Sequence, residues 1–186
     1  VIARALSGDF KELSAEYQME GRLWSPQVRW SQRACFEISE DLCQPLAALR
    51  SSLRLVKSDL HPHVTASVWR EVAEQVDQHL LSAVLGKGML SLSGAKQWRF
   101  DVEAVAGVFS LFTSKPMNIL RRLNQASALL TLSVEELKEV AEAVSGLGGR
   151  EAEDLLAKYS LSRLSREQIK TLCKQRSDLQ DEEVVE

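Results

Sequence analysis

Cysteine, proline and glycine are all scarce in this chain of 186 residues. The three cysteines, Cys35, Cys43 and Cys173, are odd in number, are spread along the chain and form no CxxC pair. They argue against a disulfide framework and predict buried free thiols in a reducing compartment. Only four prolines and nine glycines interrupt a sequence rich in leucine, alanine, glutamate and arginine, which favours an all-helical chain.

Strong charge of one sign and long apolar runs are also lacking. A net charge of -3 gives no indication of a nucleic-acid or acidic-membrane partner. The longest nearly uncharged run, residues 104–114, is far shorter than the roughly 20 residues that span a bilayer. No basic-then-apolar leader precedes it, so we expect a soluble, cytoplasmic protein. Because the chain begins with valine, we interpret it as a piece of a longer protein.

The dominant pattern is an apolar seam over residues 42–85. Aliphatic side chains recur at steps of three and four residues, which places them on one helix face. They are Leu42, Leu46, Leu49, Leu53, Val56, Leu60, Val64, Val68, Val72, Val76, Leu80 and Val84. Pro62 interrupts this seam and predicts a break within residues 59–63. We therefore expect two long helices around which the rest of the chain is organised.

Shorter apolar patterns predict further helices on both sides of this pair. Residues 1–20 have helical spacing, residues 86–96 are expected to form a loop, and another apolar face follows over residues 100–112. Pro116 favours a helix restart, and two capping-box patterns begin at Ser133 and Ser165. No segment alternates with a period of two, so the sequence predicts an all-α, multi-helix bundle. We expect one domain over residues 1–177 and a frayed acidic tail over residues 178–186.

Candidate chemical motifs are weak. His61 and His63 flank a proline and His79 lies apart, so no ligand set for a metal is complete. The Gly-Lys-Gly run at 86–88 lacks the remaining positions of a phosphate loop and is explained by a helix end. Acidic stripes within residues 135–154 are expected to be solvated, without the burial that acid–base catalysis requires. We expect no catalytic residue, no cofactor and no metal.

Basic side chains mixed with aromatic ones are the best candidates for contact with a partner. They are Lys96, Arg99, Lys115, Arg121 and Arg122, with Trp98 and Phe100 among them. They can form a patch for an acidic helix of another protein; the alternative is a set of solvated charges. Trp98 and Arg99 are expected to be exposed, because tryptophan and arginine dominate interface hot spots. Phe100 is expected in the core, and Asp101 is expected to cap the next helix.

Three collinear segments resemble a known family. They are LCQPL at 42–46 leading to VWREV at 68–72, GAKQWRFD at 94–101 followed by FSLF at 109–112, and KPMN at 115–118 leading to LTL at 130–132. Together they are similar to the C-terminal region of the RINT/TIP family over about residues 17–177. The spacing between segments departs from the family pattern by a few residues, which identifies a divergent member.

The resemblance implies the last domain of a CATCHR-type helical rod in the Dsl (NRZ) tethering complex. Such a complex sits peripherally on the endoplasmic reticulum and captures Golgi-derived COPI vesicles by binding SNAREs and sister subunits. Partner binding would then involve Trp98, Arg99, Arg121 and Arg122. Two alternatives stay open: a subunit of the conserved oligomeric Golgi complex, and a small helical enzyme or ligand-binding protein with a pocket between helices.

Overall fold

A computed structural model of the protein describes residues 1–15, 17, 37–86, 88–146 and 150–179. The predicted all-α fold is confirmed, since the described elements are all helices. They are α1 (Ile2–Leu13), α3 (Glu40–Asp59), α4 (Pro62–Leu85), α5 (Leu92–Val108), η1 (Phe109–Leu111), η2 (Pro116–Asn118), α6 (Arg121–Leu130), α7 (Val134–Gly146), α8 (Arg150–Lys158) and α9 (Arg166–Gln175). None of these helices is long and apolar enough to cross a membrane.

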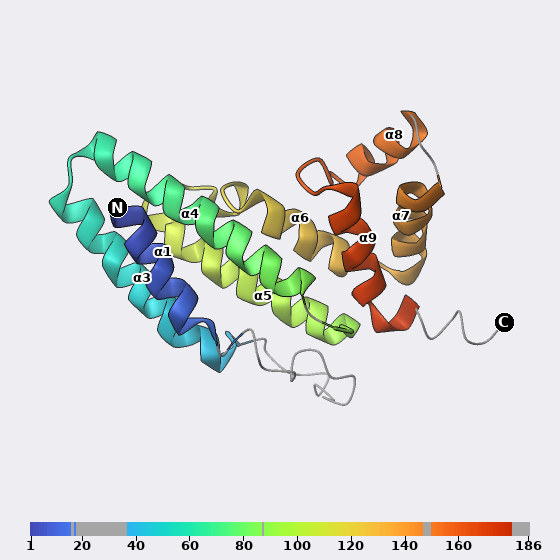
Figure 1. Ribbon diagram of the computed structural model, residues 1–186, viewed down its shortest axis with the longest axis horizontal. Helices are drawn as coiled ribbons and strands as arrows, with labels where there is room; N and C mark the ends of the chain where they lie inside the picture. The colour runs from blue at the N-terminus through green and yellow to red at the C-terminus, as the bar shows by residue number, and fades with distance from the viewer. Residues whose placement is uncertain (16, 18–36, 87, 147–149, 180–186) are drawn as a thin grey trace.

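The helices form an elongated bundle. Figure 1 shows α1, α3, α4 and α5 running along its length, while α7, α8 and α9 gather at the end that carries the C-terminus. Helix α6 joins the two regions, because it packs against α4 and α5 on one side and against α9 on the other. The buried side chains form one continuous hydrophobic cluster from Phe10 in α1 to Leu172 in α9.

The predicted break between the two long helices is confirmed. Helix α3 ends at Asp59, Leu60 takes an extended conformation, and Pro62 is the first residue of α4. The hydroxyl of Thr65 in the first turn of α4 donates to the carbonyl oxygen of Val56 at 3.2 Å. This bond ties the two helix ends together, so the chain turns sharply instead of continuing as one bent helix.

The predicted loop over residues 86–96 is wrong beyond Leu90. Helix α5 begins at Leu92, and the Ser91 hydroxyl accepts a hydrogen bond from the N–H of Gly94 at 3.1 Å. Gly94 and Ala95, which were expected in the loop, are buried in the first turn of α5. Asp101 consequently lies in the middle of α5 and not at a helix start.

The predictions for helix caps, for Pro116 and for the cysteines are confirmed in part. The capping boxes at Ser133 and Ser165 are confirmed, each by reciprocal hydrogen bonds with the residue three positions later. Pro116 begins only the short turn η2, and α6 starts at Arg121. Of the thiols, Cys173 is buried and Cys43 is exposed. Cys35, the expected connector at 21–33 and the tail from 180 lie outside the described residues.

Two buried carboxylates cap helices other than their own. Asp101 of α5 accepts hydrogen bonds from the backbone N–H and the hydroxyl of Ser39, the N-cap of α3, at 3.0 and 2.7 Å. Tyr17 and Gln97 also donate to this carboxylate. The prediction that Asp101 caps the helix that follows it is therefore wrong, because Asp101 lies within α5 and its carboxylate binds the start of α3. In the same way, Asp77 of α4 accepts from the N–H groups at the start of α6.

The last residue of α9 and the residue after it cap two helix C-termini. The Gln175 amide donates to the carbonyl oxygens of Val84 and Leu85 at the end of α4, at 2.8 and 3.1 Å. The Arg176 guanidinium donates to the carbonyl oxygens of Leu130 and Leu132 at and just beyond the end of α6. Because helix ends leave carbonyl groups without partners, these bonds fix α9 against α4 and α6.

Candidate interaction surface

The predicted basic residues do not form one patch. Arg99 and Lys96 line a cavity of about 400 Å³ on the surface of α5. Arg121 and Arg122 line another of about 340 Å³ between α4 and α6. The two cavities share no lining residue, and Lys115 lines neither of them.

The expected exposure of Trp98 is wrong. Its side chain is only 2 % exposed, whereas Phe100, expected in the core, is half-buried. Ala95, Trp98, Val102 and Val105 all lie on the buried face of α5, at the helical spacing of three and four residues. That spacing is present in the sequence and would have assigned Trp98 to the core.

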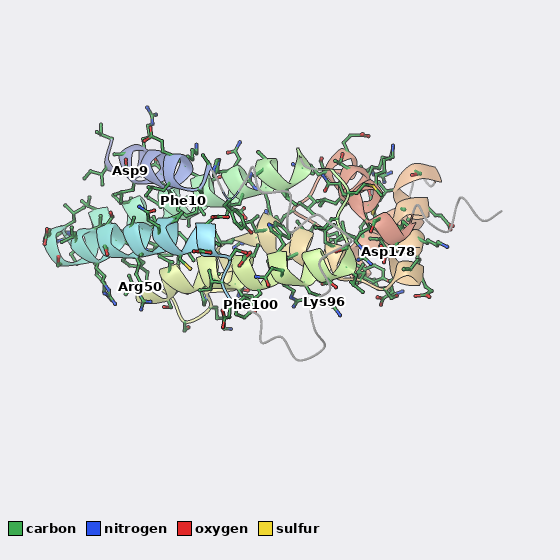
Figure 2. All side chains as sticks on the ribbon, turned by 90° about the horizontal axis from the view of Figure 1, so that it is seen from below. Asp9, Phe10, Arg50, Lys96, Phe100 and Asp178 are labelled. Atoms are coloured by element: carbon green, nitrogen blue, oxygen red, sulfur yellow. The ribbon has the colours of Figure 1, made fainter. Side chains whose placement is uncertain are left out.

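The α5 surface carries two exposed cations, Lys96 and Arg99. Lys96 and Phe100 lie along the outer edge of the helix (Figure 2). Arg99 is exposed but is engaged by Glu103, with Nε 3.3 Å from the carboxylate oxygen. Its Nη1 also donates to the hydroxyl of Thr131 at 3.2 Å. These local partners satisfy the guanidinium within the chain.

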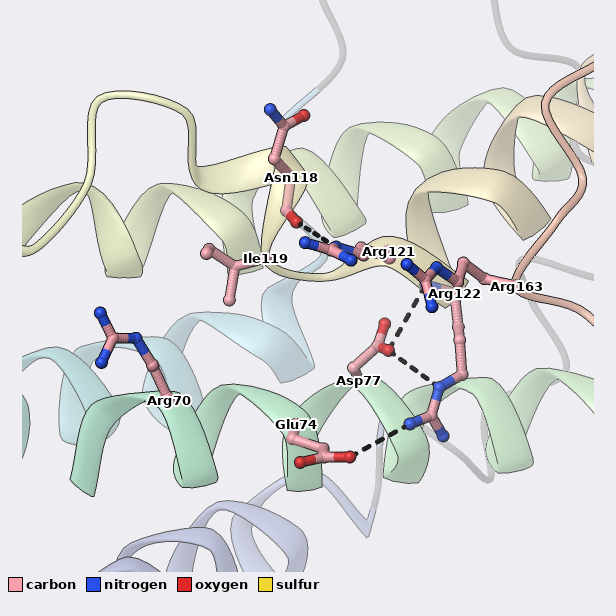
Figure 3. A pocket seen from close by; sticks show the side chains of 8 residues that line it. All are labelled: Arg70, Glu74, Asp77, Asn118, Ile119, Arg121, Arg122 and Arg163. Carbon is pink, nitrogen blue, oxygen red and sulfur yellow. Dashed lines mark hydrogen bonds and ion pairs between the residues drawn. The ribbon is translucent and has the colours of Figure 1, made fainter. Parts of the chain in front are cut away.

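The second cavity brings four arginines together, and we name it the arginine trough (Figure 3). Its arginines come from α4, from the start of α6 and from the segment between α8 and α9. The lining residues are Arg70, Glu74, Asp77, Asn118, Ile119, Arg121, Arg122 and Arg163. A third cavity, of about 380 Å³, adjoins the trough and shares Asn118, Arg121 and Arg163 with it. The two together form an extended depression.

One arginine of the trough is held by internal carboxylates. Asp77, whose side chain is 5 % exposed, accepts from the N–H of Leu123 at 2.9 Å and lies 3.4 Å from Nε of Arg122. Nη2 of Arg122 also lies 3.5 Å from Glu74 (Figure 3). Burial raises the pKa of Asp77, while the N–H groups and the guanidinium oppose that rise. Arg122 therefore anchors the start of α6.

The other three arginines are placed without a carboxylate. Arg70 lies over the ring of Trp69, with Cζ 5.1 Å from the ring centroid. Nε of Arg121 donates to the carbonyl oxygen of Asn118 at 3.1 Å. Arg163 is held by its backbone N–H, which donates to the side chain of Gln125 at 2.7 Å.

The guanidinium groups of Arg70, Arg121 and Arg163 differ from that of Arg122 in their pairing. In the part of the chain that the structure describes, none of the three guanidinium groups takes part in an ion pair. Guanidinium groups of this kind bind carboxylates or phosphates through paired N–H donors. Sequence reasoning identified Arg121 and Arg122 but missed Arg70 and Arg163, since only the fold brings these segments together.

Comparison with known proteins gives one match. A family model described as the RINT-1/TIP-1 family matches residues 1–176, nearly the whole chain. The searches of curated proteins and of solved structures returned no match. The match includes the segments that carried the resemblance and extends it to the first residue. The chain belongs to the RINT-1/TIP-1 family, which is related to vesicle tethering.

Proposed function

We propose that this domain is a protein-interaction domain of a tethering complex on the endoplasmic reticulum that receives Golgi-derived COPI vesicles. In this proposal it is the last domain of a CATCHR-type rod and binds the N-terminal helical domain of an endoplasmic-reticulum SNARE. It reaches the membrane peripherally, through its partners and sister subunits. The observation that carries the proposal is the family match over residues 1–176.

The physical properties of the bundle support a binding role. Its core is filled by aliphatic and aromatic side chains, so the surface is what remains for function. Depressions between helices can receive a helix of a partner protein. Affinity would come from buried apolar area, while charge would fix orientation and register. We further propose that the domain catalyses no reaction and uses no cofactor.

Isothermal titration of the folded domain with cytosolic N-terminal domains of endoplasmic-reticulum SNAREs tests this proposal. We expect saturable binding to at least one of them. The N-terminal domains of plasma-membrane SNAREs serve as the matched control, because they share the helical fold and are expected not to bind. Equal binding to both sets, or no binding to any endoplasmic-reticulum SNARE by a domain with a cooperative unfolding transition, would overturn it.

A further inference from the structure

We infer that the arginine trough is the docking site for an acidic, amphipathic helix of a partner protein. Arg70, Arg121 and Arg163 would pair with carboxylates of that helix. The inference rests on the proposed function only in taking the partner to be a protein, and it adds the site and the chemistry of recognition.

The first observation that supports this docking site is the charge balance of the trough. Four arginines and two acids line it, and both acids are engaged by the same arginine, Arg122. Among the described residues the other three guanidinium groups take part in no ion pair, and four arginines against two acids give the lining a formal charge of +2. Arginine is the side chain best suited to such pairing, because its planar fork binds a carboxylate through two parallel hydrogen bonds.

The second observation is how these three arginines are held in place. Arg70 is held over the ring of Trp69, and Arg121 is held by the carbonyl oxygen of Asn118. Arg163 comes from another segment, whose backbone is fixed to Gln125 of α6. Side chains that are already positioned lose less conformational entropy when a partner binds. The guanidinium groups of Arg70 and Arg121 are thus already positioned, while Arg163 is placed at the same surface through its backbone.

The shape of the surface favours a helix over a small anion. The trough continues into the adjoining cavity through Asn118, Arg121 and Arg163, so the charges border an extended depression. Ile119 lines the trough and Met117 lines its continuation, giving apolar contacts between the charges. An amphipathic helix with acidic residues beside an apolar one complements this arrangement.

An anionic membrane fits the surface less well. Membrane-binding surfaces carry clusters of lysine and arginine that add their attraction over a broad face. Here the chain has a net charge of -3, and Glu74 and Asp77 lie within the trough itself. Carboxylates of a peptide can be placed beside the arginines and away from these acids, whereas a continuous lipid surface cannot.

A peptide titration with two matched variants tests the inference. The probe is a fluorescent, helix-forming synthetic peptide with glutamates at positions i, i+4 and i+7 flanking leucines; its control has glutamine at those positions. The trough variant is Arg70→Glu, Arg121→Glu and Arg163→Glu. The control variant is Arg4→Glu, Arg50→Glu and Arg54→Glu, which changes three exposed arginines of α1 and α3 and gives the same net charge.

We expect the unmodified domain to bind the glutamate peptide in preference to the glutamine peptide. The trough variant should bind the glutamate peptide about tenfold more weakly or worse, because three ion pairs are lost and three glutamates now repel the carboxylates of the peptide. The control variant should keep its affinity within about twofold, apart from the screened effect of net charge. Equal losses in the two variants, or no preference for the glutamate peptide, would overturn the inference.

Two further arms separate the alternatives. Saturation by inorganic phosphate or by phosphatidylserine vesicles without peptide binding would overturn the inference in favour of a simple anion or a lipid. A SNARE domain that binds the unmodified domain and the trough variant equally well would refute the site and leave the proposed function standing. Peptide binding at the trough without binding of any SNARE domain would support the site and contradict the proposed partner.

Discussion

Replacement of Arg176 by alanine removes the buried cation that holds the end of α9 against α6. The side chain of Arg176 is 0 % exposed. Its Nη1 donates to the carbonyl oxygens of Leu130 and Leu132, the second at 3.1 Å. Its Nε and Nη2 donate to the carboxylate of Asp178 at 2.9 and 2.6 Å. The substitution therefore removes four hydrogen bonds from one guanidinium group.

The loss of stability comes from the polar groups that no longer have a partner once the guanidinium is removed. Two carbonyl oxygens at the end of α6 lose their donor, and an unsatisfied buried polar group costs about 1–3 kcal/mol. The carboxylate of Asp178 is 32 % exposed, so water solvates it and it adds a smaller penalty. We expect Arg176→Ala to lower the free energy of unfolding by about 2–6 kcal/mol, the cost of leaving two buried carbonyl oxygens without a donor. Arg176→Lys should fall between, because the ammonium keeps the charge but cannot make the bidentate contact.

Urea unfolding followed by circular dichroism measures this loss as a lower transition midpoint at an unchanged slope. Arg54→Ala, an exposed arginine of α3, is the matched control and should leave the midpoint nearly unchanged. If Arg176→Ala and Arg54→Ala shift the midpoint equally, Arg176 does not stabilise the fold as described.

Three further predictions concern single side chains. Trp98→Ala should lower the free energy of unfolding by about 3–5 kcal/mol as a core deletion, whereas Arg99→Ala should not; equal urea midpoints would contradict this. Burial raises the pKa of Asp101, so its contribution to stability is complete below the unfolded pKa of about 3.9 and is lost as the pH rises through the folded pKa. Asp101→Asn removes this loss, and the midpoint of the variant should fall less than that of the unmodified domain as the pH is raised from about 4 to about 7. Burial raises the pKa of the Cys173 thiol to about 12, so iodoacetamide should modify exposed Cys43 before Cys173 in peptide mapping; faster modification of Cys173 in the folded domain would refute its burial.

Local patterns in the sequence predicted most of the fold. Pro62 marks the start of α4, and the aliphatic seam before it lies in the core from Leu42 to Val56. The capping boxes at Ser133 and Ser165 begin helices as expected. These features depend on residues within a few positions of one another, so one sequence contains the information needed to find them.

Contacts between distant segments could not be predicted in the same way. Asp101 accepts from Ser39, and Arg176 donates to Leu130, across separations that no local pattern reveals. Without those partners, Asp101 could only be interpreted as a cap for the helix that follows it in the sequence. Trp98 is a different case, because the helical spacing within α5 contained its burial and the preference of tryptophan for interfaces was given more weight.

Only two of the four arginines of the candidate site could be predicted from the sequence, because the others come from distant segments. Arg121 and Arg122 are adjacent in the sequence and were identified together, but their roles differ in the structure. Arg122 is engaged by Asp77 and Glu74, while Nε of Arg121 donates to the carbonyl oxygen of Asn118. Arg70 and Arg163 reach the same depression from distant segments, which only the packing of α4, α6 and the segment before α9 brings together.

The most direct test of a binding role for this domain is an NMR titration that observes the arginine Nε–Hε signals as an endoplasmic-reticulum SNARE N-terminal domain is added. The account predicts that the signals of Arg70, Arg121 and Arg163 shift and saturate, while those of Arg50 and Arg54 on α3 stay in place. Shifts confined to Arg50 and Arg54, or unchanged spectra at saturating SNARE domain, would contradict it.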